Sequence, residues 1–399
     1  MRGLLGHQSI RWLSKEVLTP PGYTKKSINH LKRFFIDKIR ASGPITVAEY
    51  MKTSVSAPQV GYYGQFSEKQ RVFGDSGDFI TSPELTQLFG EMIGVWVFHE
   101  LANTGYRGPW QLVELGPGRA QLMTDVLSSL EKFQDKDVSV HLVETSDALI
   151  GEQERILCVD NSTPPTVFIA NEFLDALPIH QFSRNSKNPE VWHETYINLD
   201  KHSDDLCFMT SKAENIHSKG LIPSYIREDS SRKTWECSPE AGTVVSQIAD
   251  RITSFGGFGL LIDYGHDGSR DTHSFRAYKK HQQVDPLKSP GEVDLTADVD
   301  FGYLSSLVKE TTLVYGPNNQ REFLAQLGIE ARLRRLLKVC KDRSTQEQLI
   351  QAYNMLMGDM GEKFKALSIF PKTLGTIMEA RKGPAGFAQG KPVDNKSSN

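Results

Sequence analysis

The sequence predicts an α/β protein with a parallel β-sheet that helices cover on both faces. Continuous apolar runs, which are typical of strands buried on both faces, alternate with helical segments. These runs are residues 111–115, 138–144, 166–172 and 258–265. A glycine-rich turn directly follows the first run, and open sheets of this class bind ligands beyond the carboxyl ends of their strands.

Helices are expected before the sheet. Apolar residues at helical spacing predict a helix over 28–41, and Thr46 with Glu49 has the spacing of a capping box before a second, short helix. Ser82 suits the N-cap of a long helix from about 83 to 101, whose apolar residues form a one-sided stripe.

The order of elements divides the chain into regions. Helical segments over 119–133 and 146–156 follow the first two strands. β-rich segments then interrupt the alternation and predict an antiparallel insertion, and after residue 299 the pattern is mostly helical, over 299–309, 321–340 and 345–358. The expected regions are a presequence at 1–18, N-terminal helices at 25–106, the core at 107–270 with its insertion near 180–235, a substrate-side and helical region at 271–370, and a disordered tail at 382–399.

Composition and charge exclude several classes of protein. The chain has 399 residues and a formal net charge of −3, which argues against a generic nucleic-acid binder. Its four cysteines are scattered without a C-x-x-C pair, as expected in a reducing compartment. No apolar run approaches the roughly 18–20 residues that a membrane span requires. We therefore expect neither a nucleic-acid partner nor a membrane span.

Residues 1–18 have the composition of a mitochondrial presequence. No acidic residue precedes Glu16, whereas Arg2, Arg11 and Lys15 are basic, and the apolar residues between them could line one side of a helix. An ordinary basic tail is the alternative interpretation.

The stretch QLVELGPGRAQLM (111–123) is the first candidate binding site. Gly116 and Gly118 match the first two glycines of the dinucleotide fingerprint G-x-G-x-x-G/A, but Gln121 stands where its third small residue belongs. An NAD site is therefore disfavoured.

S-adenosylmethionine fits this loop better because it has no pyrophosphate. Glu114, at the end of the first strand, suits its ammonium group, and Glu144, at the end of the second, can accept hydrogen bonds from both ribose hydroxyls. Both carboxylates are expected at the carboxyl edge of the sheet.

Polar residues at the end of the third strand form the candidate catalytic site. Asn171, Glu172 and Asp175 follow the run 166–170. For a guanidinium acceptor, which is cationic at any accessible pH, one or two carboxylates can hold the planar group and direct one nitrogen at a methyl group. We predict this role for Glu172 and Asp175. The alternative for Asp175 is that it caps the short helix before Pro178.

Two other polar segments suggest no site. His266, His273 and His281 lack the H-E-x-x-H spacing and a cysteine partner, so we expect no metal centre. Asp263 and Tyr264 are read as substrate-side or structural groups. The acidic segment 294–301 matches no calcium loop and is expected to be a solvated turn.

Together, several motifs resemble the MidA-type mitochondrial methyltransferases, the family of the arginine methyltransferase that assists assembly of respiratory complex I. The likeness runs from about residue 28 to 370. The motifs are GPITVAEYM, GDFITSPE, LVELGPGR, HLVE, the spaced pattern NEF-D-LP-H-F, DYGHDG and DLTADVDF.

The resemblance implies a class I S-adenosylmethionine-dependent methyltransferase fold, Rossmann-like, acting in the mitochondrial matrix. It also implies symmetric dimethylation of an arginine in the 49 kDa-type subunit of complex I during assembly. Carried over residue by residue, Glu114, Gly116, Gly118, Arg119 and Glu144 match the cofactor motifs, and Asn171 and Glu172 match the active-site strand end.

The sequence departs from the family at two places. Ala120 replaces a usual third glycine, which is harmless at negative φ and costly at positive φ, and we expect it to be tolerated. Between Glu144 and the third strand only 21 residues intervene, too few for the extra strand of the family. A non-catalytic assembly chaperone with a weakened cofactor site is therefore the second hypothesis.

Overall fold

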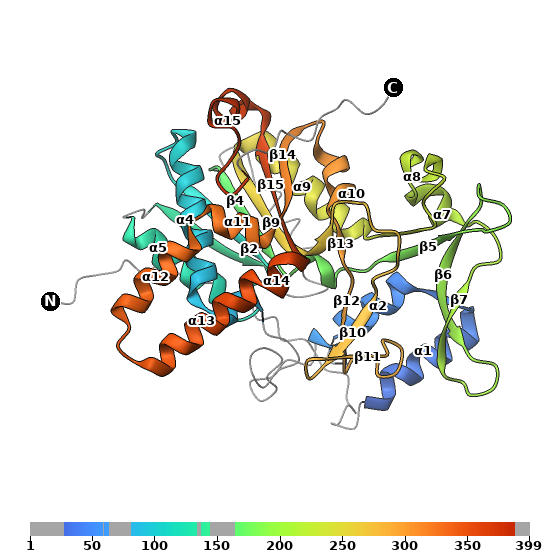
Figure 1. Cartoon of the computed structure of the whole chain (residues 1–399). Helices are drawn as coiled ribbons and strands as arrows, with labels where there is room; N and C mark the ends of the chain where they lie inside the picture. Colours follow the sequence, from blue (N-terminus) through green and yellow to red (C-terminus); the bar gives the residue numbers. More distant parts are fainter. Residues whose placement is uncertain (1–27, 59, 64–80, 134–136, 144–163, 388–399) are drawn as a thin grey trace.

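The four predicted apolar runs form one central sheet in the computed structural model, which describes residues 28–58, 60–63, 81–133, 137–143 and 164–387 (Figure 1). The runs become parallel strands in the hydrogen-bonded order β9-β4-β2-β3. Their bounds are β2 (Trp110–Leu115), β3 (Val138–Val143), β4 (Thr166–Asn171) and β9 (Gly257–His266). The predicted helix over 146–156 lies outside the described residues.

Two antiparallel strands extend the sheet beyond β9. β15 (Phe364–Pro371) pairs with β9 and with β14 (Thr312–Asn319), and the short β13 (Val299–Asp300) pairs with the end of β9. The expectation of a mostly helical region after residue 299 was therefore incomplete. β15 is buried along nearly its whole length, and pairing with two strands outweighs the helix preference of its Ala, Leu and Lys residues.

Helices cover both faces of the sheet, as predicted. Along β4, Val167 and Ile169 face a core formed with α4 (Gln87–Thr104) and α5 (Gln121–Lys132), while Phe168 and Ala170 face a second core. The first core also includes residues of α11 (Gln320–Gln326), α12 (Ile329–Val339), α13 (Arg343–Met357) and α15 (Gly375–Arg381). The second core is formed by α9 (Pro239–Phe255) and α10 (Phe301–Val308). α14 (Asp359–Lys363) and a 3₁₀ turn, η3 (Lys372–Leu374), flank β15.

The long helix predicted from about 83 to 101 is two helices. α3 (Ser82–Leu85) ends at Thr86, whose extended backbone (φ −170°, ψ 144°) breaks the helix and whose side chain accepts a hydrogen bond from the Leu88 N–H to begin α4. The buried residues of α4 also extend beyond the predicted one-sided apolar stripe. They include Glu91 and Glu100, which form ion pairs with Arg332 and Arg381. The segment predicted to be helical over 321–340 likewise breaks, at Gly328.

The predicted β-rich insertion forms a second sheet, at the right of Figure 1. Its strand order is β1-β6-β5-β8, with β7 paired to β6. The N-terminal helices α1 and α2 and the small sheet β10–β12 pack into a common core with it. In α2 the Thr46 side chain accepts the hydrogen bond from the Glu49 N–H, as the capping-box spacing predicts. The bounds are α1 (Ile28–Ser42), β1 (Ile45–Thr46), α2 (Val47–Ser56), β5 (His180–Arg184), β6 (Trp192–Leu199), β7 (Leu206–Thr210), α7 (Ile216–Leu221), α8 (Ser224–Glu228), β8 (Thr234–Cys237), β10 (Arg276–Lys279), β11 (Gln282–Val284) and β12 (Asp294–Thr296).

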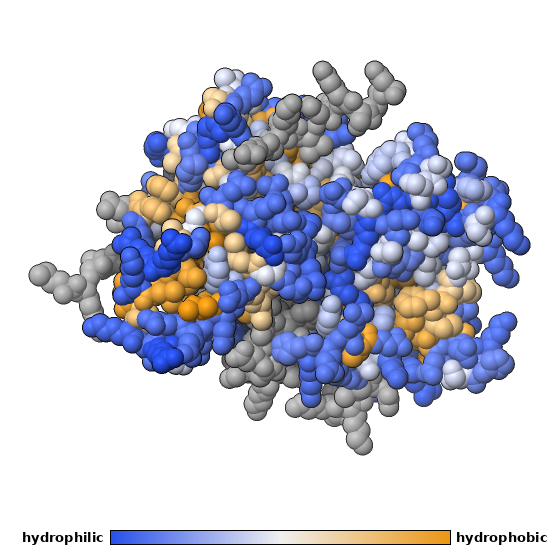
Figure 2. All heavy atoms as spheres, viewed as in Figure 1, coloured by the Kyte–Doolittle hydropathy of each residue, from blue (hydrophilic) through white to orange (hydrophobic). Residues whose placement is uncertain are grey.

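The surface is mainly hydrophilic on the face shown in Figure 2, with apolar residues gathered at the left, in the region of α12 and α13. Exposed apolar side chains at these helices include Val339, Ile350 and Met355. None of the described helices combines the length and apolarity needed to cross a bilayer. Phe387, within the segment from 382 that the sequence suggested to be disordered, is buried beside Phe323.

Candidate functional site

The glycine loop lies between β2 and α5 and needs its glycines for two different reasons. Gly116 and Gly118 have φ values of +66° and +50°, which only glycine adopts without strain. A Cβ atom on Gly116 would also lie 2.9 Å from Cδ2 of the Phe173 ring. The loop and the turn after β4 are therefore in direct contact, and no side chain fits between them.

The other predicted residues of the loop have different surroundings. Glu114 is buried in β2, whereas Arg119 is largely exposed, with Nη1 4.0 Å from Oε1 of Glu84. Glu144 lies outside the described residues.

Ala120 has a left-handed backbone conformation, with φ 58° and ψ 26° at the N-cap of α5. This is the costly case, because a Cβ atom in that region crowds the following carbonyl. Of the two cases distinguished in the sequence analysis, the one at positive φ is observed, so the loop contains local strain at the position where the resemblance leads us to expect glycine.

Glu172 begins the turn that follows β4 and is itself strained, with φ +51°. Its Oε1 accepts hydrogen bonds from the backbone N–H of Ser82 (2.8 Å) and from Nδ2 of Asn171 (3.3 Å). Burial raises the pKa of Glu172 to about 7, and the negative charge of Asp175 adds to this shift. A strained residue with such a pKa is typical of functional sites.

Asp263 holds this turn in place. Its Oδ2 accepts hydrogen bonds from the backbone N–H groups of Phe173, Leu174 and Asp175 at 3.0, 2.8 and 3.2 Å. Its Oδ1 accepts a hydrogen bond from the Tyr264 N–H. Of the two roles considered for Asp263, the structural role is therefore the one observed. Burial and the charges of Asp175 and Glu172 raise its pKa, against the effect of the backbone donors.

Asp175 lies inside the short 3₁₀ helix η2 (Leu174–Ala176), which begins after Phe173. Its Oδ2 accepts a hydrogen bond from the Thr296 hydroxyl at 2.7 Å. Burial raises its pKa, whereas the Thr296 hydrogen bond and the positive charge of Arg276 lower it. The alternative that Asp175 is the helix cap was therefore wrong, and its carboxyl group belongs to the polar cluster at this edge of the sheet.

The acidic segment 294–301 is not a solvated turn, contrary to expectation. Asp294 and Asp300 are buried, and Asp298 forms ion pairs with Arg270 and Arg276. Charge alone suggested exposure, but the partners come from segments distant in sequence. The Ala297 N–H also donates to the Asp175 carbonyl oxygen, so this segment forms one wall of the site.

The structure thus brings Asn171, Glu172 and Asp175 together on one turn, directly beside the loop of Gly116. Three supporting residues were not predicted for the site: Ser82, Thr296 and Asp263, the last considered only as a structural or substrate-side group. A signal existed for two of them, because Ser82 lies in the GDFITSPE motif and Thr296 in DLTADVDF.

The donor set suits S-adenosylmethionine. A buried carboxyl group, Glu114, precedes a loop whose Gly116 cannot accept a Cβ atom. The Oδ1 atom of Asn171 is buried and accepts no hydrogen bond from the described residues, so it is available to a donor on a ligand. These features define a class of protein, namely an α/β protein that holds a nucleotide-derived cofactor over a glycine loop.

Comparison with known proteins identifies the family. The family described as "Putative S-adenosyl-L-methionine-dependent methyltransferase" matches residues 92–317, more than half of the chain. "Protein arginine methyltransferase NDUFAF7 homolog, mitochondrial" of Caenorhabditis elegans is 69% identical over 97% of this chain and 97% of its own length. "Protein arginine methyltransferase NDUFAF7, mitochondrial" of Homo sapiens is 35% identical over 90% of this chain and 88% of its own length. The chain belongs to this S-adenosyl-L-methionine-dependent methyltransferase family, which confirms both the resemblance and the cofactor predicted from the sequence.

Solved structures confirm the predicted fold class. A protein from Burkholderia thailandensis, solved bound to S-adenosyl-homocysteine, superimposes with a TM-score of 0.72 at 22% identity, covering 94% of this chain and 99% of its own. A native structure from the same organism gives a TM-score of 0.71 at 21% identity.

Proposed function

We propose that the chain is a protein arginine N-methyltransferase whose catalytic residues are Glu172 and Asp175. The observation that carries this proposal is the turn after β4, where two carboxyl groups are held beside the glycine loop by the Asp263 contacts. Glu114, Gly116, Gly118, Arg119, Glu144 and Asn171 are proposed to hold the cofactor.

Bound S-adenosylmethionine supplies an electrophilic methyl group on a sulfonium. The protein must then bind a guanidinium group, orient one nitrogen and accept the proton that this nitrogen loses when the N–C bond forms and the thioether leaves. Asp175 and Glu172 can hold the planar cation by charge-assisted hydrogen bonds. A carboxyl group with a pKa of about 7 is matched to proton transfer near neutral pH, so Glu172 is the proposed base.

The finer assignment rests on the names of the relatives and on the family resemblance. We infer type II activity, which dimethylates arginine symmetrically, on the 49 kDa-type subunit of complex I in the mitochondrial matrix. The relatives named NDUFAF7 are described as mitochondrial protein arginine methyltransferases, and the basic composition of residues 1–18 agrees with this location.

The test is transfer of labelled methyl groups to the purified 49 kDa-type subunit, followed by hydrolysis and separation of the methylarginines. We expect label in symmetric dimethylarginine, lost in Glu172→Gln and retained in Glu190→Gln, which alters an exposed glutamate. Label on another residue type, or label that survives Glu172→Gln, would overturn the assignment.

An assembly chaperone without chemistry is the second candidate, favoured by the short connection of 21 residues before β4. The two functions separate in cells that lack the endogenous protein. If Glu172→Gln restores complex I assembly as fully as the unaltered chain does, binding alone is the function.

A further inference from the structure

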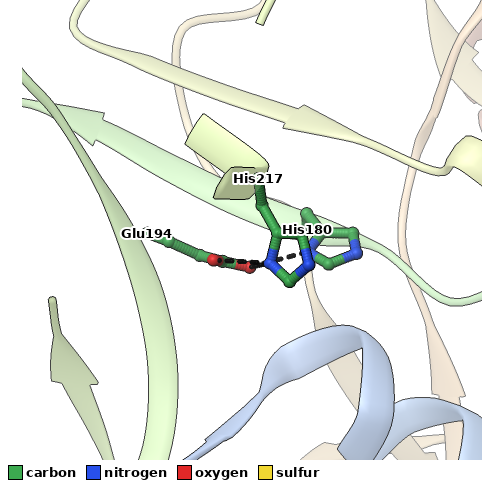
Figure 3. Close-up of side chains that lie close together, drawn as sticks. All are labelled: His180, Glu194 and His217. Carbon is green, nitrogen blue, oxygen red and sulfur yellow. Dashed lines mark hydrogen bonds and ion pairs between the residues drawn. The ribbon is translucent and has the colours of Figure 1, made fainter. Parts of the chain in front are cut away.

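Three side chains capable of binding a metal ion converge in the β-rich insertion. His180 begins β5, Glu194 lies in the middle of β6 and His217 lies in α7 (Figure 3). Nδ1 of His180 lies 2.6 Å from Oε1 of Glu194, and Nδ1 of His217 lies 2.9 Å from Oε2. One potential ligand atom from each residue lies within 4.8 Å of the others. The expectation of no metal centre concerned the spacing of His266, His273 and His281 and did not consider these three residues, which are distant along the chain.

Among the residues that the structure describes, no lysine or arginine forms an ion pair with Glu194. The side chain is fully buried, and its hydrogen-bond partners include the two imidazoles, the amide of Asn215 and the Tyr196 hydroxyl. A buried carboxylate without lysine or arginine requires another positive charge nearby.

The geometry is close to that of a three-ligand metal site. Ligand atoms about 2.0–2.2 Å from a tetrahedral zinc ion lie roughly 3.3 Å apart, whereas the nitrogen–oxygen separations here are 2.6, 2.9 and 3.2 Å. The two separations that involve Oε1 of Glu194 must widen by less than about 1 Å, and the imidazole nitrogens, which lie within 4.8 Å of each other, must reach the same spacing. Asn215 donates to Glu194 and contacts the Tyr196 hydroxyl, which orients the carboxylate as supporting residues do at metal centres.

We propose that His180, Glu194 and His217 bind a divalent transition-metal ion of the zinc type. Imidazole and carboxylate ligands suit this class of ion. The His217 side chain is 38% exposed, which leaves a fourth position accessible to water. The ion ties β5, β6 and α7 together and secures the start of β5, five residues after Asp175. Its role is to stabilise the insertion, and the proposal does not depend on the proposed methyl transfer.

The experiment is a calorimetric titration of the full chain with Zn²⁺ after removal of metals by chelation. We expect one equivalent to bind to the unaltered chain and a loss of affinity of at least about 100-fold in His180→Ala and in His217→Gln. His202→Ala is the matched control, because His202 is exposed in the turn between β6 and β7, and its binding should be unchanged.

A second measurement does not depend on the fold of the variants. Co²⁺ added to the unaltered chain should give the visible absorption bands of a four- or five-coordinate site, and excess Zn²⁺ should abolish them. Absence of one-equivalent binding by the unaltered chain, or equal affinity in a folded His217→Gln variant, would overturn the proposal.

Discussion

The carboxylate of Asp263 accepts a 2.8 Å hydrogen bond from the backbone N–H of Leu174, a residue 89 positions earlier in the chain. Through this bond and its two neighbours, β9 fixes the turn that carries Glu172 and Asp175. The carboxyl groups proposed to act on the substrate therefore depend on a residue that need not touch it.

Asp263→Asn should weaken both stability and methyl transfer. An asparagine amide has only one oxygen, so its NH₂ group would face either the three backbone N–H groups of the turn or the Tyr264 N–H. The donors on that side would lose their acceptor, and a buried donor without an acceptor costs roughly 1–3 kcal/mol. Denaturant unfolding should show a loss of that size. Asp267→Asn, at an exposed turn, should change stability by less than about 0.5 kcal/mol, and equal losses in both variants would contradict the role of Asp263.

Glu172→Gln should stabilise the fold at alkaline pH while abolishing methyl transfer. The pKa of Glu172 is raised from its ordinary value of 4.5 to about 7, so ionisation opposes folding. The stability available below pH 4.5 is therefore lost as the pH rises through 7, a loss of roughly 3 kcal/mol at about 1.4 kcal/mol per pKa unit. Unfolding at pH 8 should show this gain for the variant, shrinking to about 1 kcal/mol or less at pH 5. A gain that is independent of pH would be inconsistent with a raised pKa.

Gly116→Ala adds only one methyl group, but it should weaken cofactor binding strongly. The added Cβ atom meets the Phe173 ring at 2.9 Å, and the backbone has φ +66°, so both the loop and the turn that carries Glu172 must shift. Titration with S-adenosyl-homocysteine should show at least a tenfold weaker affinity. Gly220→Ala is the matched control, because a Cβ atom there has nothing within 4 Å. Unchanged affinity in Gly116→Ala would show that the loop does not contact the ligand.

Ala120→Gly should raise stability. The left-handed conformation costs an alanine roughly 1–2 kcal/mol, whereas the additional chain entropy of glycine costs about 0.5–1 kcal/mol, which leaves a net gain of up to about 1.5 kcal/mol. Thermal unfolding measures the gain. Ala213→Gly, at an exposed position that is not left-handed, should lose stability instead, and a loss in both variants would argue against strain at Ala120.

Local patterns predicted the part of the fold in which neighbours in sequence are neighbours in space. The apolar runs gave β2, β3, β4 and β9, because continuous burial leaves a visible signature. The pattern missed β14 and β15, whose strand state depends on pairing with each other and with β9. It also placed Asp294 and Asp298 in solvent, because their partners Tyr63 and Arg276 lie far away in the chain.

In the candidate site, too, local pattern predicted some residues, and contacts distant in sequence determine the others. Residues at strand ends, such as Asn171 and Glu172, could be predicted from the alternation of strands and helices. Ser82 donates to Glu172 and Thr296 donates to Asp175, and these contacts do not follow from the local pattern because they span 90 and 121 positions. The only sequence signal for these two residues is that they lie in motifs of the family resemblance.

The bond between Ser82 and Glu172 has one further consequence. The Ser82 amide at the start of α3 donates to Oε1 of Glu172, so a substrate that moves this oxygen would also loosen the first turn of α3. The exchange rate of the Ser82 amide hydrogen should therefore report, from a segment 90 residues upstream, whether the carboxyl group proposed as the base has left this hydrogen bond.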